Sequence, residues 1–352
     1  MPNEILTSAI ERVAQGEDLS GDEAAEVLAR IMHGEASEIQ MAGFLIGLRT
    51  KGETVEELAG LARTMRELAT PVAVGREDLL DTAGTGGGRS TFNVSTTAAL
   101  IAAGAGVTVA KHGNRSATSR CGSADVLEAL GARIDLSPDG VAACIEEAGF
   151  GFMFAPAHHS ATRFVIPVRR ELAVRTIFNL LGPLTNPAGA RRQLIGVSDP
   201  AFQEIVAGAL ARLGVDRALV VSGEDGLDEL SIAADTRVIE VNGEQLERYV
   251  LSPAQAGVRV AGDAVGAAAL AGGSPEENAR VVHAIFAGEA GPHTELAALN
   301  AGAAIYAAGA ADSIAQGLEL ARVTLAQGAA AGALERFVAA TLRHAPAQAA
   351  AS

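Results

Sequence analysis

The sequence has no tryptophan, only two cysteines and no long run of large apolar residues. Cys121 and Cys144 are too few for a disulfide framework, which favours a reducing compartment such as the cytoplasm. Aromatic residues make up 3% of the chain, which argues against a surface that stacks nucleic-acid bases. The most apolar stretch, 97–109, consists mainly of alanine and glycine and is shorter than the roughly 20 residues of a membrane helix. We therefore expect a cytoplasmic protein with no membrane segment.

Positive charge is also scarce. Lys and Arg number 27 against 42 Asp and Glu, which gives a formal net charge of −15. Proteins that bind nucleic acid through its phosphates need a positive face, so this balance opposes that class. The N-terminus has no basic stretch followed by an apolar run, so we expect no secretory signal. With 352 residues, 49% of them hydrophobic, the chain is long enough for two folding units with buried cores.

Residues 1–72 have the pattern of a small helical domain. Three pairs have capping-box spacing: Ser20 with Glu23, Ser37 with Gln40, and Thr54 with Glu57. Apolar residues follow each pair at helical intervals, and glycines stand where helices should stop. The helices are too short to bury all their apolar positions among themselves, so we expect a homodimer through this domain.

From about residue 78 short apolar runs alternate with helical stretches. The predicted strands are 79–81, 107–111, 151–154, 193–197, 218–222 and 238–241. The predicted helices are 96–103, 124–130, 141–148 and 201–213, and several more follow Pro275. Such alternation is typical of an α/β domain with a mainly parallel central sheet, here spanning residues 73–352.

A glycine-rich loop, 84–88, follows the first predicted strand and precedes a helix that starts near Ser95 and Thr96. Glycines let backbone N–H groups converge on one point, and a helix start adds free donors, so the pattern suits phosphate. An ordinary loop and helix cap would give the same pattern. The loop fits neither the dinucleotide-binding nor the Walker pattern.

The stretch from Lys111 to Arg120 places three cations among small polar residues at the end of a predicted strand. Ligands of open α/β sheets sit at this edge, so the stretch favours a polyanionic ligand. A solvated basic turn is the alternative. Lys111 directly follows the apolar strand, which favours the functional interpretation.

Two further segments are ambiguous on their own. His158 and His159 are adjacent, and neighbours in sequence rarely bind one metal ion together, so we do not expect zinc. Arg169 has the chemistry to clamp a carboxylate, or simply to pair with Glu171 at the surface. The carboxylates at 228–229 follow a predicted strand and would suit magnesium, although an acidic turn explains them equally well.

The order and spacing of these segments resemble the anthranilate phosphoribosyltransferases of tryptophan biosynthesis. The matching stretches are 84–87, 93–96, 111–116, 122–125, 178–187 and 225–229. The resemblance covers nearly the whole chain. It implies a fold shared with pyrimidine nucleoside phosphorylases, in which part of 169–190 rejoins the helical domain and the ligand cleft lies between the domains.

The resemblance also implies the ligands of each substrate and metal. For 5-phosphoribosyl 1-pyrophosphate (PRPP) the matching positions are Gly84, Gly87, Gly88, Thr91, Asn93, Val94, Ser95, Thr96, Lys111, His112, Gly113, Asn114, Arg115, Ser116, Ser119 and Ser123. For anthranilate they are Gly84, Asn114 and Arg169. Mg²⁺ would bind Ser95, Asp228 and Glu229, and the catalytic roles fall to Lys111, Asp228 and Glu229. The expected partners are these small molecules and a second copy of the chain.

The sequence departs from the family pattern at one place. The glycine loop usually ends in Asp, whereas this chain has Gly88, and the segment that follows is one residue shorter. Two alternative functions remain at this point. A pyrimidine nucleoside phosphorylase would share the fold, and a non-enzymatic relative that binds nucleic acid would need a basic groove.

Overall fold

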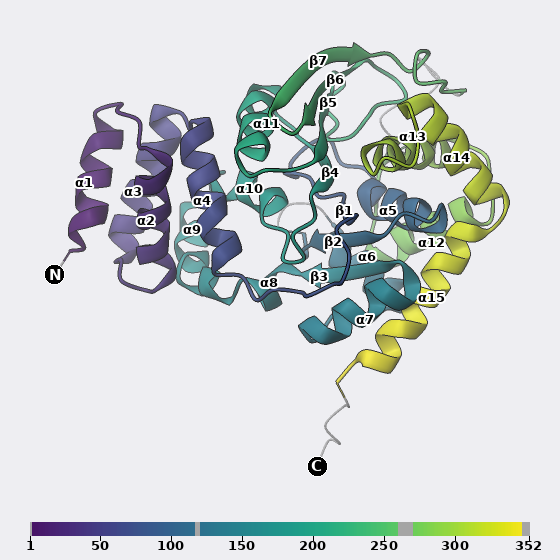
Figure 1. Ribbon diagram of the computed structural model, residues 1–352, viewed down its shortest axis with the longest axis horizontal. Coiled ribbons are helices and arrows are strands. Elements are labelled where there is room, and N and C mark those ends of the chain that lie inside the picture. The colour runs from purple at the N-terminus through teal and green to yellow at the C-terminus, as the bar shows by residue number, and fades with distance from the viewer. Residues whose placement is uncertain (1, 117–119, 260–269, 347–352) are drawn as a thin grey trace.

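A bundle of helices adjoins a single twisted sheet, and the later helices cover the far side of that sheet (Figure 1). The computed structural model describes residues 2–116, 120–259 and 270–346. The predicted architecture, a small N-terminal helical domain and a larger α/β domain, is confirmed.

Four helices form the N-terminal bundle: α1 (Glu4–Ala14), α2 (Gly21–Met32), α3 (Glu38–Lys51) and α4 (Val55–Glu67). Two of the predicted capping boxes are complete, at the starts of α2 and α4. The third is only half formed, because Ser37 caps α3 but the Gln40 amide instead bonds the backbone of Asn3. Asn3 is itself the N-cap of α1, a start that no capping-box spacing predicts.

The sheet has seven strands in the order β3-β2-β1-β4-β5-β6-β7. Their bounds are β1 (Leu80–Asp81), β2 (Val109–Gly113), β3 (Phe150–Phe154), β4 (Arg192–Gly196), β5 (Arg217–Gly223), β6 (Thr236–Asn242) and β7 (Gln245–Leu251). The first five strands in sequence are parallel, which confirms the prediction, while β6 and β7 pair antiparallel at one edge. β7 was not predicted, because an exposed edge strand needs few apolar residues.

Two apolar cores lie on opposite faces of the sheet. Leu194 and Leu219 face one core, and their neighbours Ile195 and Val220 face the other, as alternation along a strand requires. The first core contains α5 (Val94–Gly104), α6 (Ser123–Ala129), α7 (Pro138–Ala148) and the four C-terminal helices. These are α12 (Pro275–Phe286), α13 (Pro292–Ala307), α14 (Ile314–Ala326) and α15 (Ala329–His344). The second core contains α11 (Gln203–Arg212) and the N-terminal bundle.

Short helices after β3 carry the chain back to the bundle. They are α8 (Ala155–His158), η1 (Ser160–Phe164), α9 (Ile166–Leu172), α10 (Phe178–Leu181) and η2 (Gly182–Leu184). α9 packs against α3, and α10 packs against α4. At the end of α9, Ala173 takes a left-handed conformation with φ of 52°, which turns the chain sharply toward the sheet.

Two expectations from composition concern disulfides and membranes. Both cysteines are buried thiols, and no disulfide joins them. Within the described part of the chain, no helix combines the length and apolarity that spanning a membrane requires.

Candidate active site

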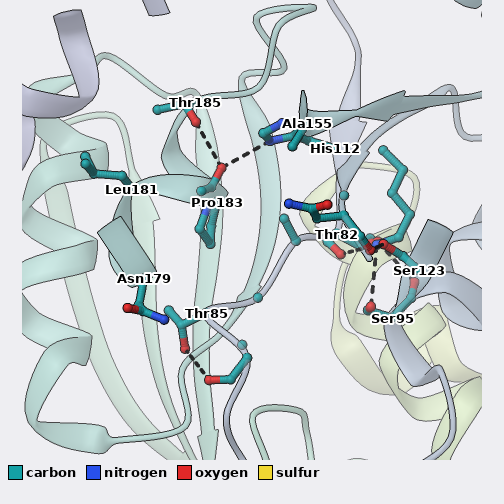
Figure 2. A pocket seen from close by; sticks show the side chains of 18 of the residues that line it. Thr82, Thr85, Ser95, His112, Ser123, Ala155, Asn179, Leu181, Pro183 and Thr185 are labelled. Carbon is teal, nitrogen blue, oxygen red and sulfur yellow. Dashed lines mark hydrogen bonds between the residues drawn. The ribbon is translucent and has the colours of Figure 1, made fainter. Parts of the chain in front are cut away.

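A cleft of about 430 Å³ opens at the carboxyl ends of the parallel strands. One wall comes from the sheet and the other from α4, α9 and α10. It brings together many of the residues predicted from the sequence: Gly84, Asn93, Ser95, Thr96, Lys111, His112, Gly113, Asn114, Ser123, Arg169, Asp228 and Glu229. In Figure 2, Thr82, Ser95 and Ser123 cluster on one side, while Asn179, Leu181, Pro183 and Thr185 face them from the other.

Several predicted site residues do not line this cleft. They are Gly87, Gly88, Thr91, Val94, Arg115 and Ser116. Val94 is buried in the core at the start of α5. The Arg115 guanidinium bonds Asp125 at 2.7 Å and Glu128 at 2.6 Å, and its contact with PRPP stays a prediction. Ser119 lies outside the described residues.

Backbone bonds hold the glycine loop after β1. The Thr85 N–H donates to the Gly196 carbonyl at 2.8 Å, which ties the loop to the end of β4. Gly86 and Gly87 have φ of +64° and +86°, a conformation that other residues rarely adopt. Gly84, Thr85 and Gly86 line the cleft, and the binding of phosphate by this loop stays a prediction.

Lys111 is a buried cation at the floor of the cleft. Its Nζ donates to the Thr82 hydroxyl at 3.0 Å and to the Ser95 hydroxyl at 3.4 Å (Figure 2). Burial lowers the pKa of the ammonium, while Asp81 and Glu229 act in the opposite direction. The basic-turn alternative is thus wrong for Lys111, which faces the cleft and is almost fully buried.

Asp228 and Glu229 face the cleft from the turn after β5. Burial raises the pKa of both carboxyls, and the Asp228 charge helps to raise the pKa of Glu229 to about 8. The Lys111 charge acts in the opposite direction on the pKa of Glu229. Two crowded carboxylates beside the Ser95 hydroxyl are hard oxygen donors, so the residues fit a divalent cation that keeps part of its hydration.

Arg169 projects from α9 into the cleft as an unpaired cation. Its guanidinium lies over the Phe178 ring at 5.2 Å, and burial lowers its pKa. It forms no ion pair with Glu171 or with any other residue in the described ranges. A recessed cation without a counterion favours an anionic ligand over the surface-pair interpretation.

Two buried histidines line the opposite side of the cleft. His112 Nδ1 bonds the Gly182 carbonyl and His159 Nε2 bonds the Thr185 carbonyl, both at 3.1 Å. Burial lowers their pKa values to about 3 and about 4, so both rings are neutral. His158 bonds the Thr70 carbonyl through Nδ1, and no cluster of three metal-ligating side chains occurs among the residues described.

Some residues of the cleft had no predicted role. Asn179, Pro183 and Thr185 belong to the 178–187 stretch, which carried the family resemblance. That stretch indicated that these residues belong to the site, but it gave none of them a role. Thr82 and His159 line the cleft because of how distant segments pack, which a single sequence does not reveal.

Gly88, where the sequence departs from the family pattern, lies in a crowded place in the structure. A Cβ at Gly88 would lie 2.5 Å from Asp228 Oδ1 and 2.9 Å from the Asp228 backbone nitrogen. The next residue, Arg89, donates its N–H to the Gly226 carbonyl at 2.9 Å, and its side chain lies 3.5 Å from Asp225. The shortened loop therefore rests directly on the acidic turn, with no room for a side chain at position 88.

We expect Gly88→Asp to lower activity most at high Mg²⁺. The new carboxylate would displace the loop and add a third negative group beside Asp228, where it would bind additional metal or repel the donor. Initial rates across a magnesium titration test this. Gly88→Asn adds the same bulk without charge, so it separates the two effects. Superimposable curves for Gly88→Asp and the natural protein would show that the position is neutral.

The comparisons with known proteins agree with the geometry. A family model described as "Glycosyl transferase family, a/b domain" matches residues 76–331, and one described as "Glycosyl transferase family, helical bundle domain" matches 7–69. An anthranilate phosphoribosyltransferase of Rubrobacter xylanophilus is 53% identical over 95% of this chain and 97% of its own length. Its counterpart from Halorhodospira halophila is 50% identical over 96% and 98%.

Two solved structures of anthranilate phosphoribosyltransferases are also similar to this chain. The crystal structure of anthranilate phosphoribosyltransferase from Thermus thermophilus has a TM-score of 0.89 at 49% identity, covering 95% of this chain and 99% of that one. The Saccharomyces cerevisiae anthranilate phosphoribosyltransferase in complex with PRPP and Mg has a TM-score of 0.88 at 25% identity, covering 97% and 99%.

Proposed function

This chain belongs to the anthranilate phosphoribosyltransferases, and we propose that its cleft transfers phosphoribose from PRPP to the amine of anthranilate. The products are N-(5-phosphoribosyl)anthranilate and pyrophosphate, in a pentosyltransferase step of tryptophan biosynthesis. The relatives give no support to a nucleoside phosphorylase or to a nucleic-acid-binding protein.

The observation that carries the proposal is the separation of two anion sites within one cleft. One end holds the glycine loop, Lys111 and the acidic pair, which suit a pyrophosphate with its metal. The other end holds the unpaired Arg169, which suits a single carboxylate. A reaction that joins a pyrophosphate donor to an aromatic acid needs both.

Transfer at the anomeric carbon passes through an oxocarbenium-like state, as glycosidic cleavage does. The aromatic amine of anthranilate is already neutral near pH 7, so no side-chain nucleophile is required. The residues of the cleft act by positioning and by stabilising charge on the leaving group. Lys111 and the loop N–H groups would face the pyrophosphate, and Arg169 with Asn114 would aim the acceptor amine at the sugar.

Ser95, Asp228 and Glu229 would hold Mg²⁺ in this cleft. A bound Mg²⁺ would neutralise charge on the pyrophosphate and orient it. The raised carboxyl pKa values support this assignment, because crowded, buried carboxylates gain from a bound cation. The yeast relative bound with PRPP and Mg supports it further.

A direct assay tests the function. The purified protein is mixed with PRPP, Mg²⁺ and anthranilate, and the loss of anthranilate fluorescence is followed. We expect loss that requires all three additions. The proposal fails if anthranilate fluorescence is unchanged while the protein is folded, or if thymidine or uridine with phosphate is the substrate pair instead.

We also propose that residues 1–72, together with part of 169–190, form the dimerisation domain of a cytoplasmic homodimer. Ile39 and Ile46 on α3 are 85% and 37% exposed, although both are large and apolar. An exposed apolar stripe on one helix is typical of a surface that a second subunit covers.

Light scattering at micromolar concentration should therefore give the mass of a dimer. Ile39→Asp should shift the protein toward monomer, because it would bury a charge in the interface. Val323→Asp on α14 is a matched control, since Val323 is 48% exposed on a helix far along the chain. A monomeric natural protein would contradict the prediction, as would equal effects of the two variants.

A further inference from the structure

Two side chains bind the outer side of the glycine loop at a single atom. The Gly86 carbonyl oxygen accepts one hydrogen bond from Arg175 Nη1 and another from Ser198 Oγ, both at 3.0 Å. In a trans peptide the C=O of one residue and the N–H of the next point in opposite directions. Fixing the Gly86 carbonyl therefore also fixes the direction of the Gly87 N–H.

The Arg175 guanidinium also lies directly on Gly87. A Cβ at Gly87 would be 1.9 Å from Arg175 Nη1, so a side chain there would displace the guanidinium from the loop. Gly87 also has φ of +86°, a second and independent reason for glycine. The arginine and the glycine thus form a matched contact.

Packing does not hold this side of the loop. Gly87, Arg175, Ser198 and Asn179 border a second cavity of about 360 Å³, which adjoins the substrate cleft at Asn179. Because a cavity lies there and not packed core, few apolar contacts fix the position of the loop. The Gly86 carbonyl is held there by the bonds from Arg175 and Ser198 and by a longer one from the Thr85 hydroxyl at 3.5 Å.

The helical bundle in turn holds Arg175. The Arg49 guanidinium, on α3, donates to the Arg175 carbonyl at 2.6 Å. The left-handed Ala173 ends α9 two residues earlier and turns the chain toward the loop. A continuous path therefore runs from α3 through Arg175 to the glycine loop. Such a conformation in a residue other than glycine costs free energy and persists where the surrounding structure enforces it.

We propose that Arg175 is a positioning residue, which holds the glycine loop in its donor-binding shape and couples it to the helical bundle. This inference rests on the proposed function, because it assigns the loop to PRPP. Arg175 does not line the substrate cleft in the described structure.

The test is a steady-state comparison of Arg175→Gln, Arg175→Lys and Arg170→Gln. Arg170 is a matched control, because it is an exposed arginine nearby and no hydrogen bond or ion pair of its side chain occurs in the described structure. We expect Arg175→Gln to raise the KM for PRPP about tenfold, with the KM for anthranilate unchanged. Arg175→Lys should recover part of the loss, since it keeps a charged donor. Melting temperatures should match that of the natural protein, because Arg175 is exposed.

Two further variants distinguish positioning from direct contact with the donor. Ser198→Ala removes one further donor to the Gly86 carbonyl, which also accepts a longer bond from the neighbouring Thr85 hydroxyl at 3.5 Å, and we expect it to raise the same KM by a smaller factor. Arg49→Gln should do likewise, and adding it to Arg175→Gln should have little further effect, because both act along one path. A direct contact between Arg175 and PRPP would leave Ser198→Ala without effect, and that result would overturn the proposal.

The remaining outcomes are also decisive. If Arg175→Gln behaves like Arg170→Gln, or if Arg49→Gln and Arg175→Gln are fully additive, the positioning role is wrong. An equal rise in both KM values would also contradict it. Failure of the proposed function is distinguishable, because the natural protein would then show no turnover in the same assay.

Discussion

Replacing Asp228 with Asn and Glu229 with Gln together should lower kcat at least about a hundredfold, while the protein stays folded. Both carboxylates and Ser95 line the cleft, and we propose them as the Mg²⁺ ligands because Mg²⁺ prefers hard oxygen donors. The amides keep the shape but remove the charge. Because burial and mutual repulsion disfavour the two charges, their loss should not lower the melting temperature measured without metal.

Turnover is measured at saturating PRPP across a range of Mg²⁺ concentrations. Glu224→Gln is the matched control, because Glu224 belongs to the same turn but pairs with Arg237 at the surface. It should keep normal activity. Unchanged turnover of the double variant at ordinary Mg²⁺ would remove the assignment of both residues, and a collapse of the fold would make Asp228→Asn alone the informative variant.

The fold was largely predictable because its strands are buried. The predicted strand 218–222 begins with four apolar residues in a row, as a parallel strand covered on both faces requires, and the structure places it as the central part of β5. The edge strand β7 was missed because most of its side chains are exposed, so selection for apolar residues is weak there. The apolar pattern of the sequence therefore predicted the buried strands and missed the exposed edge strand.

Site residues were predictable where a residue of suitable chemistry directly follows a predicted strand. The glycine loop and Lys111 each follow a strand, so the rule that ligands bind at strand carboxyl ends was sufficient. Arg115 has the same charge as Lys111 and lies four residues later, yet it points outward to Asp125 and Glu128. Sequence does not show which way a cation in a loop points, since that depends on the partners that the fold supplies.

Contacts between the domains were the least predictable part. Arg175 lies 89 positions from Gly86 in the chain, and His159 packs against His112 with ring centroids 5.1 Å apart. Neither pairing leaves a local pattern. Such contacts depend on the path of the chain between α8 and α10, which the left-handed turn at Ala173 helps to define.

Arg169→Ala should raise the KM for anthranilate by about 10- to 100-fold and leave the KM for PRPP nearly unchanged. A hydrogen bond to a charged group contributes about 1.5–3 kcal/mol, and the guanidinium fork suits a carboxylate. The structure gives Arg169 no competing anion within the described residues, and it stacks on Phe178 in the cleft wall. Because burial disfavours the unpaired charge, we expect no loss of thermal stability.

Arg163→Ala is the matched control, because Arg163 also lies over an aromatic ring, Phe164 at 4.6 Å, but is exposed and outside the cleft. It should leave both KM values unchanged. Arg169→Lys keeps the charge but loses the fork, so it should fall between the natural protein and Arg169→Ala. A rise in the KM for PRPP instead would mean that Arg169 binds phosphate. The assignment of the two substrates to the two ends of the cleft would then have to be exchanged, with the carboxylate of anthranilate near Lys111.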